Sequence, residues 1–340
     1  MLVCMNMKRK TKSAQSLSSL ALPALLCTAL WGSAAPMIKM GYGLMHIEGT
    51  PSVILFAGIR FFLAGLLVLL LQLPRKGKEM LPSAKAWKYI AILGLFQTFG
   101  QYFFYYMGLT QVSGTMGSVI SGTSALFSLL LAAWVYHLEK MTPAKGIGVL
   151  LGLAGIVVMN LDGFSLQFRM EGEGMILLSQ LCSAQSAVFI SMFGKKQDPV
   201  MLSAWQFMAG GAALALLGLG MGGHIQWNLA GVGCLLWLAL VSGIAYTLWG
   251  VLLAKFPVSA VGIFSCTIPM FGVLFSSLIL HESQAFSLQT LCALALITAG
   301  VLLINLAGNR KAGSGGADSF SDQTEKSEPD FAENCPSASL

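Results

Sequence analysis

The sequence predicts an all-α integral membrane protein with ten transmembrane helices, arranged as two inverted five-helix repeats. Three observations support this prediction: the composition, a series of long apolar segments, and an internal duplication. Hydrophobic residues make up 56% of the 340 residues and charged residues only 10%. A soluble domain typically carries about 25% charged residues, so the composition excludes an ordinary soluble protein.

The apolar segments are long enough for helices that cross a hydrocarbon layer of about 30 Å. They lie at about 20–45, 51–73, 86–109, 113–136, 142–161, 174–194, 199–221, 228–254, 257–280 and 285–307. A basic leader before the first segment could also belong to a cleaved signal peptide with Ser33-Ala34-Ala35 as its cleavage site. We disfavour that alternative because the apolar run continues past Ala35, and cleavage would remove half of a helix that has a counterpart in the second repeat.

The internal duplication is clearest between residues 123–160 and residues 267–305. Each copy is an apolar run, a short polar break that contains Glu, and a second apolar run that ends in Asn. His137, for example, matches His281 at an offset of 144 residues. Five helices per copy is an odd number, so the second copy must enter the membrane with the opposite polarity. Inverted repeats of this kind are common in secondary transporters.

The distribution of Lys and Arg predicts that both termini face the cytoplasm. Lys39 and Arg169 fall on the outer side and Arg60 lies inside the second apolar segment, whereas the remaining Lys and Arg residues fall in the leader, the inner loops or the tail. Cations are retained on the cytoplasmic side of membrane proteins. The chain therefore divides into a basic cytoplasmic leader (1–19), a first repeat (20–161), an extracytoplasmic loop (162–173), a second repeat (174–307) and a disordered acidic cytoplasmic tail (308–340).

Arg60 is the strongest candidate for a functional residue. An unpaired cation near the middle of a bilayer costs at least about 2.5–3.5 kcal/mol, so its side chain must face a cavity or a partner. It either binds substrate or holds the bundle together by capping carbonyls or pairing with a Tyr. Lys39, near the outer end of helix 1, is a second candidate that could instead extend to the interface.

A polar and aromatic wall is predicted on the third helix. Gln97, Gln101 and Tyr105 follow one another at intervals of four residues, beside Tyr102, and helical spacing places them on adjacent faces. The eighth helix repeats the pattern with Tyr246 and Trp249. Such a wall suits a small organic ligand, although polar side chains also join helices in membranes. Weaker candidates are Ser183, Gln185, Trp205 and Gln206.

Glu139 and Glu282 occupy the polar breaks of the two copies. They act either as gates or as caps that fix the turns between helices. The sequence contains no Walker A motif, no Ser/His/Asp arrangement and no clustered metal ligands. We therefore expect no enzyme activity, no catalytic residues, no metal, no cofactor, no use of ATP and no nucleic-acid partner.

Taken together, these features resemble the drug/metabolite transporter superfamily, specifically its ten-helix EamA-type branch. The matching residues, in chain order, are Trp31-Gly32 with Lys39, Arg60-Phe61, Gly108-Leu109, Leu138-Glu139-Lys140-Met141-Thr142, Gly152-Leu153-Ala154-Gly155, Asp198-Pro199, Trp205-Gln206, Pro269 and His281-Glu282. The first copy departs from the family pattern because Ser124-Ala125 stands where the family often has a Pro like Pro269. Trp31 joins the binding candidates through this resemblance.

The resemblance implies a transporter of small metabolites, often exported from the cell. We expect a secondary transporter in the cell membrane that moves amino-acid-like or amphipathic metabolites through a midplane cavity between its halves. A zwitterionic or anionic substrate matches the two intramembrane cations, Arg60 and Lys39. Efflux of cationic drugs is the alternative, and it is disfavoured because the first helix has no acid. A non-transporting scaffold that uses the acidic tail is a further alternative. The sequence predicts neither the oligomeric state nor the coupling ion.

Overall fold

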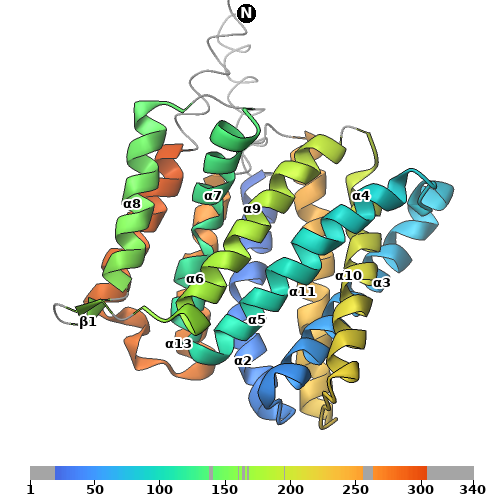
Figure 1. Cartoon of the computed structure of the whole chain (residues 1–340), viewed down its shortest axis with the longest axis horizontal. Coiled ribbons are helices and arrows are strands. Elements are labelled where there is room, and N and C mark those ends of the chain that lie inside the picture. The colour runs from blue at the N-terminus through green and yellow to red at the C-terminus, as the bar shows by residue number, and fades with distance from the viewer. Residues whose placement is uncertain are drawn as a thin grey trace, which may run out of the picture.

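The computed structural model describes residues 20–137, 141–159, 161–162, 165–166, 168–194, 196–255 and 263–304, and these residues are mostly helical. The helices form one elongated bundle (Figure 1). The predicted leader and tail lie outside the described residues, as does the whole polar stretch from 138 to 140, which includes Glu139.

The first half begins with a helix over Leu20–Leu44 that is interrupted only at Ser33, after which it is labelled α2 (Ala34–Leu44). The remaining elements of this half are α3 (Gly49–Lys76), η1 (Gly77–Met80), α4 (Ala86–Leu93), η2 (Gly94–Gly100), α5 (Gln101–Gln111), α6 (Gly114–Ser121), α7 (Ser124–Leu130), η3 (Leu131–Val135) and α8 (Pro143–Met159). A short antiparallel pair follows, β1 (Leu161–Asp162) with β2 (Ser165–Leu166), in which Leu161 is opposite Leu166.

The second half contains η4 (Met170–Gly174), α9 (Met175–Phe193), α10 (Pro199–Gly220), α11 (Leu229–Lys255), η5 (Ile263–Cys266), α13 (Thr267–Leu280), η6 (Ser283–Phe286) and a last helix over Leu288–Ile304. Helical structure thus occupies each of the predicted apolar ranges as far as they are described, and the all-α prediction is confirmed. Within the described residues, six helices are long and apolar enough to cross a membrane. Three shorter apolar helices are α8, α13 and Leu288–Ile304.

Helices at matching positions of the two halves pack against each other. Phe61 on α3 and Phe207 on α10 match at an offset of 146, and their rings stack with centroids 5.5 Å apart. The close approach of these helices requires Gly211, because a Cβ there would lie 2.9 Å from the carbonyl oxygen of Gly58 and still closer to the backbone nitrogen of Phe62. Small residues commonly permit such contacts in membranes, where apolar burial does not drive helix association.

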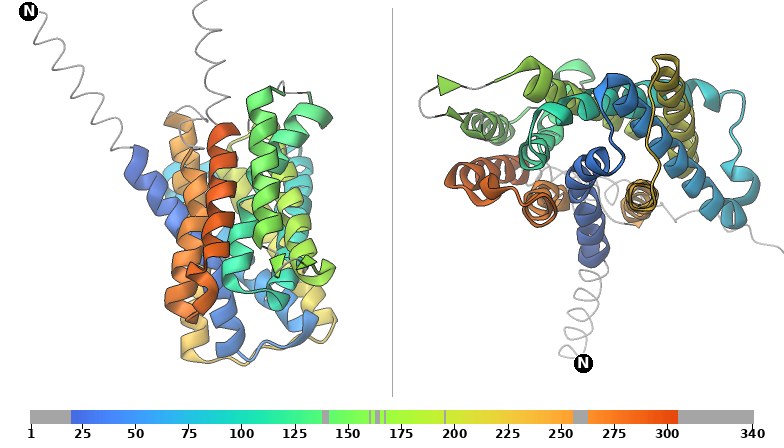
Figure 2. Two further views of the ribbon diagram at one scale, coloured as in Figure 1. Left: turned by 90° about the vertical axis from the view of Figure 1, so that its left-hand side faces the viewer. Right: turned by 90° about the horizontal axis from the view of Figure 1, so that it is seen from below.

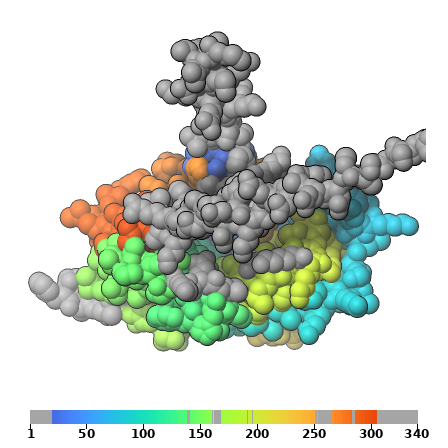
Figure 3. All heavy atoms as spheres, turned by 90° about the horizontal axis from the view of Figure 1, so that it is seen from above, coloured from blue at the N-terminus to red at the C-terminus, as the bar shows by residue number. Residues whose placement is uncertain are grey.

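The same pairing recurs in the other half of the bundle. A Cβ on Gly148 of α8 would lie 2.7 Å from the carbonyl oxygen of Gly300 in the last helix, and a Cβ on Gly272 of α13 would collide with Ser118 of α6. Figure 3 shows the orange C-terminal helices against the green part of the first half. Small residues of α6 and α13 therefore let these two helices pack closely.

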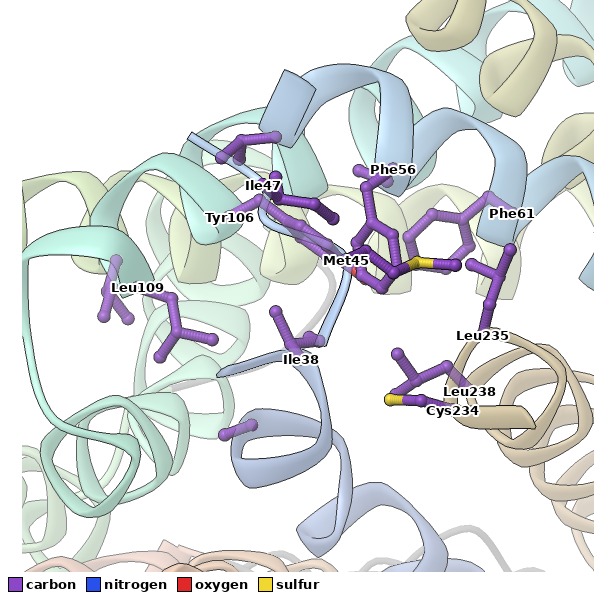
Figure 4. Packing of buried hydrophobic residues seen from close by; sticks show 14 of the residues in the cluster. Ile38, Met45, Ile47, Phe56, Phe61, Tyr106, Leu109, Cys234, Leu235 and Leu238 are labelled. Carbon is purple, nitrogen blue, oxygen red and sulfur yellow. The ribbon is translucent and has the colours of Figure 1, made fainter. Parts of the chain in front are cut away.

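The largest apolar cluster brings together α2, α3, α5 and α11 (Figure 4). Ile38, Phe56, Phe61 and Tyr106 are fully buried in it. Seen from below, α2 lies between α11 and α13 (Figure 2). This cluster surrounds the side chain of Arg60, so the apolar core of the bundle also fixes the position of its buried cation.

Asp198 caps the N-terminus of α10 and also binds a Lys of the first half. Its carboxylate accepts hydrogen bonds from the amides of Val200 at 2.8 Å and Met201 at 2.9 Å, and it pairs with Lys76. Burial alone would raise the pKa of Asp198, but the hydrogen bonds and the charge of Lys76 outweigh burial and hold the pKa below its ordinary value of 3.8. Helix N-termini favour such carboxylates.

Replacement of Gly211 by Ala should destabilise the protein, because the added methyl group would force α3 and α10 apart. Overpacking of this kind typically costs about 1–3 kcal/mol. Gly233→Ala is the matched control, since a Cβ on Gly233 of α11 meets nothing within 4 Å. Thermal unfolding of the purified protein in detergent should show a clearly lower midpoint for G211A alone. Equal midpoints for both variants would contradict the close α3–α10 packing.

Candidate functional site

Arg60 is buried in the bundle, with 2% of its surface exposed. Its Nη1 donates a hydrogen bond to the hydroxyl of Tyr106 at 2.7 Å, its Nη2 to the hydroxyl of Ser242 at 3.1 Å, and its Nε to the carbonyl oxygen of Leu238 at 3.3 Å. The guanidinium also lies 4.7 Å from the ring centroid of Phe61. The side chain thus ties α3 to α5 and α11.

All of these partners of Arg60 are neutral. Among the described residues, Lys76 and Asp198 form a salt bridge. This salt bridge does not involve Arg60. Hydrogen bonds and the faces of aromatic rings reduce the cost of burying a cation, but they leave its charge in place. An anionic group that reached Arg60 would therefore gain a strong interaction in a medium of low dielectric constant.

An aromatic cluster extends from Arg60 toward helix 1. The ring of Trp31 meets Tyr246 and Trp249 edge to face, with centroids 5.4 and 5.1 Å apart. Tyr102 stacks on Phe61 at 3.8 Å and shares a hydrogen bond with Tyr246. The structure thus brings Trp31, Tyr102, Tyr246 and Trp249 together in one aromatic wall, and the role of this wall in binding stays a prediction.

Gln97 joins this wall through an irregular stretch of helix. Residues 94–100 (η2) form a π-helix between α4 and α5, and π-helical turns often occur at functional sites. Gln97 is 3% exposed, and its Nε2 donates to the Tyr246 hydroxyl at 3.3 Å. Its Oε1 is buried and has no hydrogen-bond partner. The wider π turn changes the helical register, so Gln101 is only partly buried while Gln97 faces α11.

Tyr105 faces a different neighbour. Its hydroxyl shares a hydrogen bond with Ser121 at the end of α6. Ser121 also lines a cavity of about 30 Å³, which has room for about one or two water molecules.

The cavity lies where α6 gives way to α7, and residues at matching positions of the two halves line it. Ser121 matches Ser265, and Ala125 matches Pro269, each at an offset of 144. Thr298 of the last helix contributes a buried hydroxyl without a hydrogen-bond partner. The cavity therefore lies between the two halves and contains an unsatisfied polar atom.

Lys39 and Glu282 lie apart from Arg60, at the connection between α5 and α6. The amine of Lys39 donates to the carbonyl oxygens of Leu109 and Val112 at 3.1 and 2.6 Å. The carboxylate of Glu282 accepts hydrogen bonds from the first two amides of α6. In this conformation both side chains bind helix ends.

The weaker candidates are distributed over other contacts. Gln185 donates to the hydroxyl of Tyr136, and the carbonyl oxygen of Ser183 accepts from Ser186. Trp205 donates from its indole nitrogen to the carbonyl oxygen of Met80 at 2.7 Å, and Gln206 accepts from Thr98. Glu139 lies outside the described residues. The structure does not bring these residues to Arg60.

Tyr106 and Ser242 are the closest polar partners of Arg60, and Tyr106 was not among the predicted site residues. A signal for it exists, because Tyr106 follows Tyr102 by four residues and therefore shares its helix face. Tyr42 also belongs to this region, since its hydroxyl donates to the carbonyl oxygen of Tyr106 at 3.1 Å.

The chain is similar to known membrane transporters. Residues 19–161 and 170–306 match the EamA-like transporter family. The chain is 27% identical over 280 residues to the uncharacterized transporter YvbV of Bacillus subtilis, covering 81% of this chain and 88% of that protein. It is 26% identical over 302 residues to a protein of Salmonella typhimurium named a probable amino-acid metabolite efflux pump, covering 84% and 94%.

A solved crystal structure shares the fold. It superimposes with a TM-score of 0.62 at 22% sequence identity, covering 86% of this chain and 98% of the other.

Replacement of Tyr106 by Phe should lower the free energy of unfolding by about 1–3 kcal/mol, because it removes a hydrogen-bond acceptor from a buried charged group. Tyr89→Phe is the control, since Tyr89 packs at the edge of another apolar cluster and its hydroxyl has no hydrogen-bond partner among the described residues. Denaturation in detergent measures both variants. An unchanged stability of Y106F would show that the Arg60–Tyr106 hydrogen bond contributes nothing to the fold.

Proposed function

Because the chain belongs to the EamA-like transporter family, we propose that it is a secondary transporter that exports small amino-acid-like metabolites from the cell. In this proposal the ten predicted helices all cross the cell membrane, as two inverted repeats (20–161 and 174–307) with both termini in the cytoplasm. The family is one of transporters, so the protein functions without enzymatic chemistry of its own.

The proposal rests on the buried charge of Arg60. Its hydrogen bonds go to neutral groups, and an uncompensated cation inside a membrane protein is a feature of substrate and ion pathways. A carboxylate would supply the missing opposite charge. A guanidinium also presents paired donors that match the two oxygens of a carboxylate.

The second part of the site suits the amino group of such a substrate. Gln97 Oε1 is a buried acceptor without a partner, and its side-chain nitrogen binds Tyr246. Tyr246 in turn shares a hydrogen bond with Tyr102, which lies 5.9 Å from the Arg60 guanidinium, measured to its ring centroid. A zwitterion would place its carboxylate toward Arg60 and its ammonium group toward Gln97, with Trp31 and Trp249 beside its side chain.

Alternating access is the mechanism that this architecture supports. The helices at matching positions of the two halves meet along their lengths through glycines, and the cavity at Ser121 and Ser265 lies on that contact. Rocking of inverted repeats about such an interface exposes a midplane site to each side in turn. The printed name of the Salmonella relative supports an amino-acid-like substrate and outward transport.

The test is counterflow of labelled amino acids in proteoliposomes. Arg60→Met should lower the initial rate at least tenfold, because it preserves the length of the side chain and removes its charge. Gln97→Met should weaken transport of amino acids but spare carboxylates that lack an amino group. Gln180→Met is the control, since Gln180 is an amide of similar burial, 5% exposed, whose side chain binds Ser179 and is not part of the aromatic wall.

Two results would contradict the proposal. Wild-type counterflow by R60M would remove Arg60 from the site. Resistance of cells to quaternary ammonium compounds, without any counterflow of amino acids, would favour efflux of cationic drugs instead. Retention time on a gel-filtration column confirms that each variant is folded.

A further inference from the structure

The turn that follows α13 joins the two halves of the molecule through one carboxylate. Glu282 Oε1 accepts a hydrogen bond from the amide of Gly114 at 2.8 Å, and Oε2 accepts one from the amide of Thr115 at 2.9 Å. These amides begin α6 in the first half, whereas Glu282 belongs to the second half. This cap therefore joins the two halves beside Lys39, whereas Asp198 caps α10 of its own half and pairs with Lys76 of the first half.

The backbone around Glu282 is arranged for this contact. His281, the residue after α13, has a left-handed conformation with a φ of 53°, which is uncommon for a residue other than glycine. This conformation reverses the chain at the end of α13 and directs Glu282 to α6. His137 has a φ of 50° at the matching position of the first half, so the sharp turn is a feature of both copies.

A cation holds the same connection from its other side. The amine of Lys39, on helix 1, binds the carbonyl oxygens of Leu109 and Val112, where α5 ends. Lys39 and Glu282 are close enough to attract each other electrostatically. The short link between α5 and α6 is therefore bound at its carbonyl end by a positive side chain and at its amide end by a negative one.

The contact between α6 and α13 beside this carboxylate contains polar groups that lack hydrogen-bond partners. The hydroxyls of Thr115 and Ser276 are buried, in residues that are 2% and 0% exposed, and neither has a hydrogen-bond partner. A Cβ on Gly114 would lie 2.9 Å from Ser276 Oγ, so the Ser276 hydroxyl lies beside the residue that Glu282 binds. Buried hydroxyls without partners destabilise the closed contact, and water would satisfy them once α13 and α6 separate.

We propose that Glu282 is a latch that closes the Lys39 end of the transport path by binding the first amides of α6. Opening of that end breaks the two hydrogen bonds of Glu282 and hydrates the hydroxyls of Thr115 and Ser276. The balance between a bidentate carboxylate and two unsatisfied hydroxyls keeps the closed and open forms close in free energy. This inference rests on the proposed transport function, because it assigns the latch to one gate of the alternating-access cycle.

Thiol labelling of a reporter beneath the latch tests this proposal. The reporter is Ser276→Cys in a full-length chain whose seven native cysteines are replaced by Ser or Ala. Right-side-out and inside-out vesicles are treated with a membrane-impermeant maleimide, so the assay needs neither a substrate nor a known orientation. With Glu282 intact, we expect slow labelling from both sides. Glu282→Gln should accelerate labelling at least tenfold, from one side only, because a neutral amide offers a single weaker acceptor.

Two further variants separate a latch from an ordinary helix cap. Asp198→Asn removes a carboxylate cap of the same chemistry, together with its ion pair to Lys76 of the first half, at a place away from α6 and α13, and it should leave labelling unchanged. Glu282→Asp keeps the charge but is one methylene shorter, so it should label at an intermediate rate, and it remains informative if E282Q folds poorly.

The latch is overturned if E282Q and E282D label as slowly as the parent, or if D198N labels as fast as E282Q. The first result makes Glu282 a structural cap alone, and the second shows general loosening of the fold. Counterflow measured separately distinguishes failure of this proposal from failure of the transport function. A chain that transports amino acids but shows no E282Q effect retains the function and loses the latch.

Discussion

The burial of one positive charge among neutral partners is the constraint on which this structure depends. Arg60 is surrounded by α3, α5 and α11, and its three hydrogen bonds fix the spacing of these helices. The apolar cluster of α2, α3, α5 and α11 packs around the same point. Because a buried cation without an opposite charge is costly in a membrane protein, we propose that this charge serves substrate binding.

The sequence predicts the helices well because the signal is local. Charge-free apolar runs specify membrane-length helices whatever their neighbours are, and helices occupy the expected ranges throughout the described residues. The burial of Arg60 also follows from sequence, since a cation within such a run has nowhere else to lie. The ten membrane crossings, the inverted orientation and the functional role of Arg60 stay predictions.

The partners of the polar residues could not be predicted, because they depend on register and tertiary contact. The spacing of Gln97 and Gln101 indicates one face only for a regular α-helix, and the π-helical turn of η2 separates them. The position of Glu282 in the sequence indicates a cap for its own turn. In the structure it caps α6, more than 160 residues away. The position of Lys39 near a helix end does not indicate its partners, which are the carbonyl oxygens at the end of α5. In each case the deciding contact lies on a distant helix.

We propose that the buried charge of Arg60 selects substrates that carry a carboxylate. The most direct test is the thermal stability of the purified wild-type protein with amino acids, compared with the matching amines that lack the carboxylate. Ligands that bind only the folded protein raise its melting temperature. We expect a concentration-dependent increase with the amino acids and none with the amines. An equal increase with both classes of ligand, or an increase with the amines alone, would contradict selection of the carboxylate by Arg60.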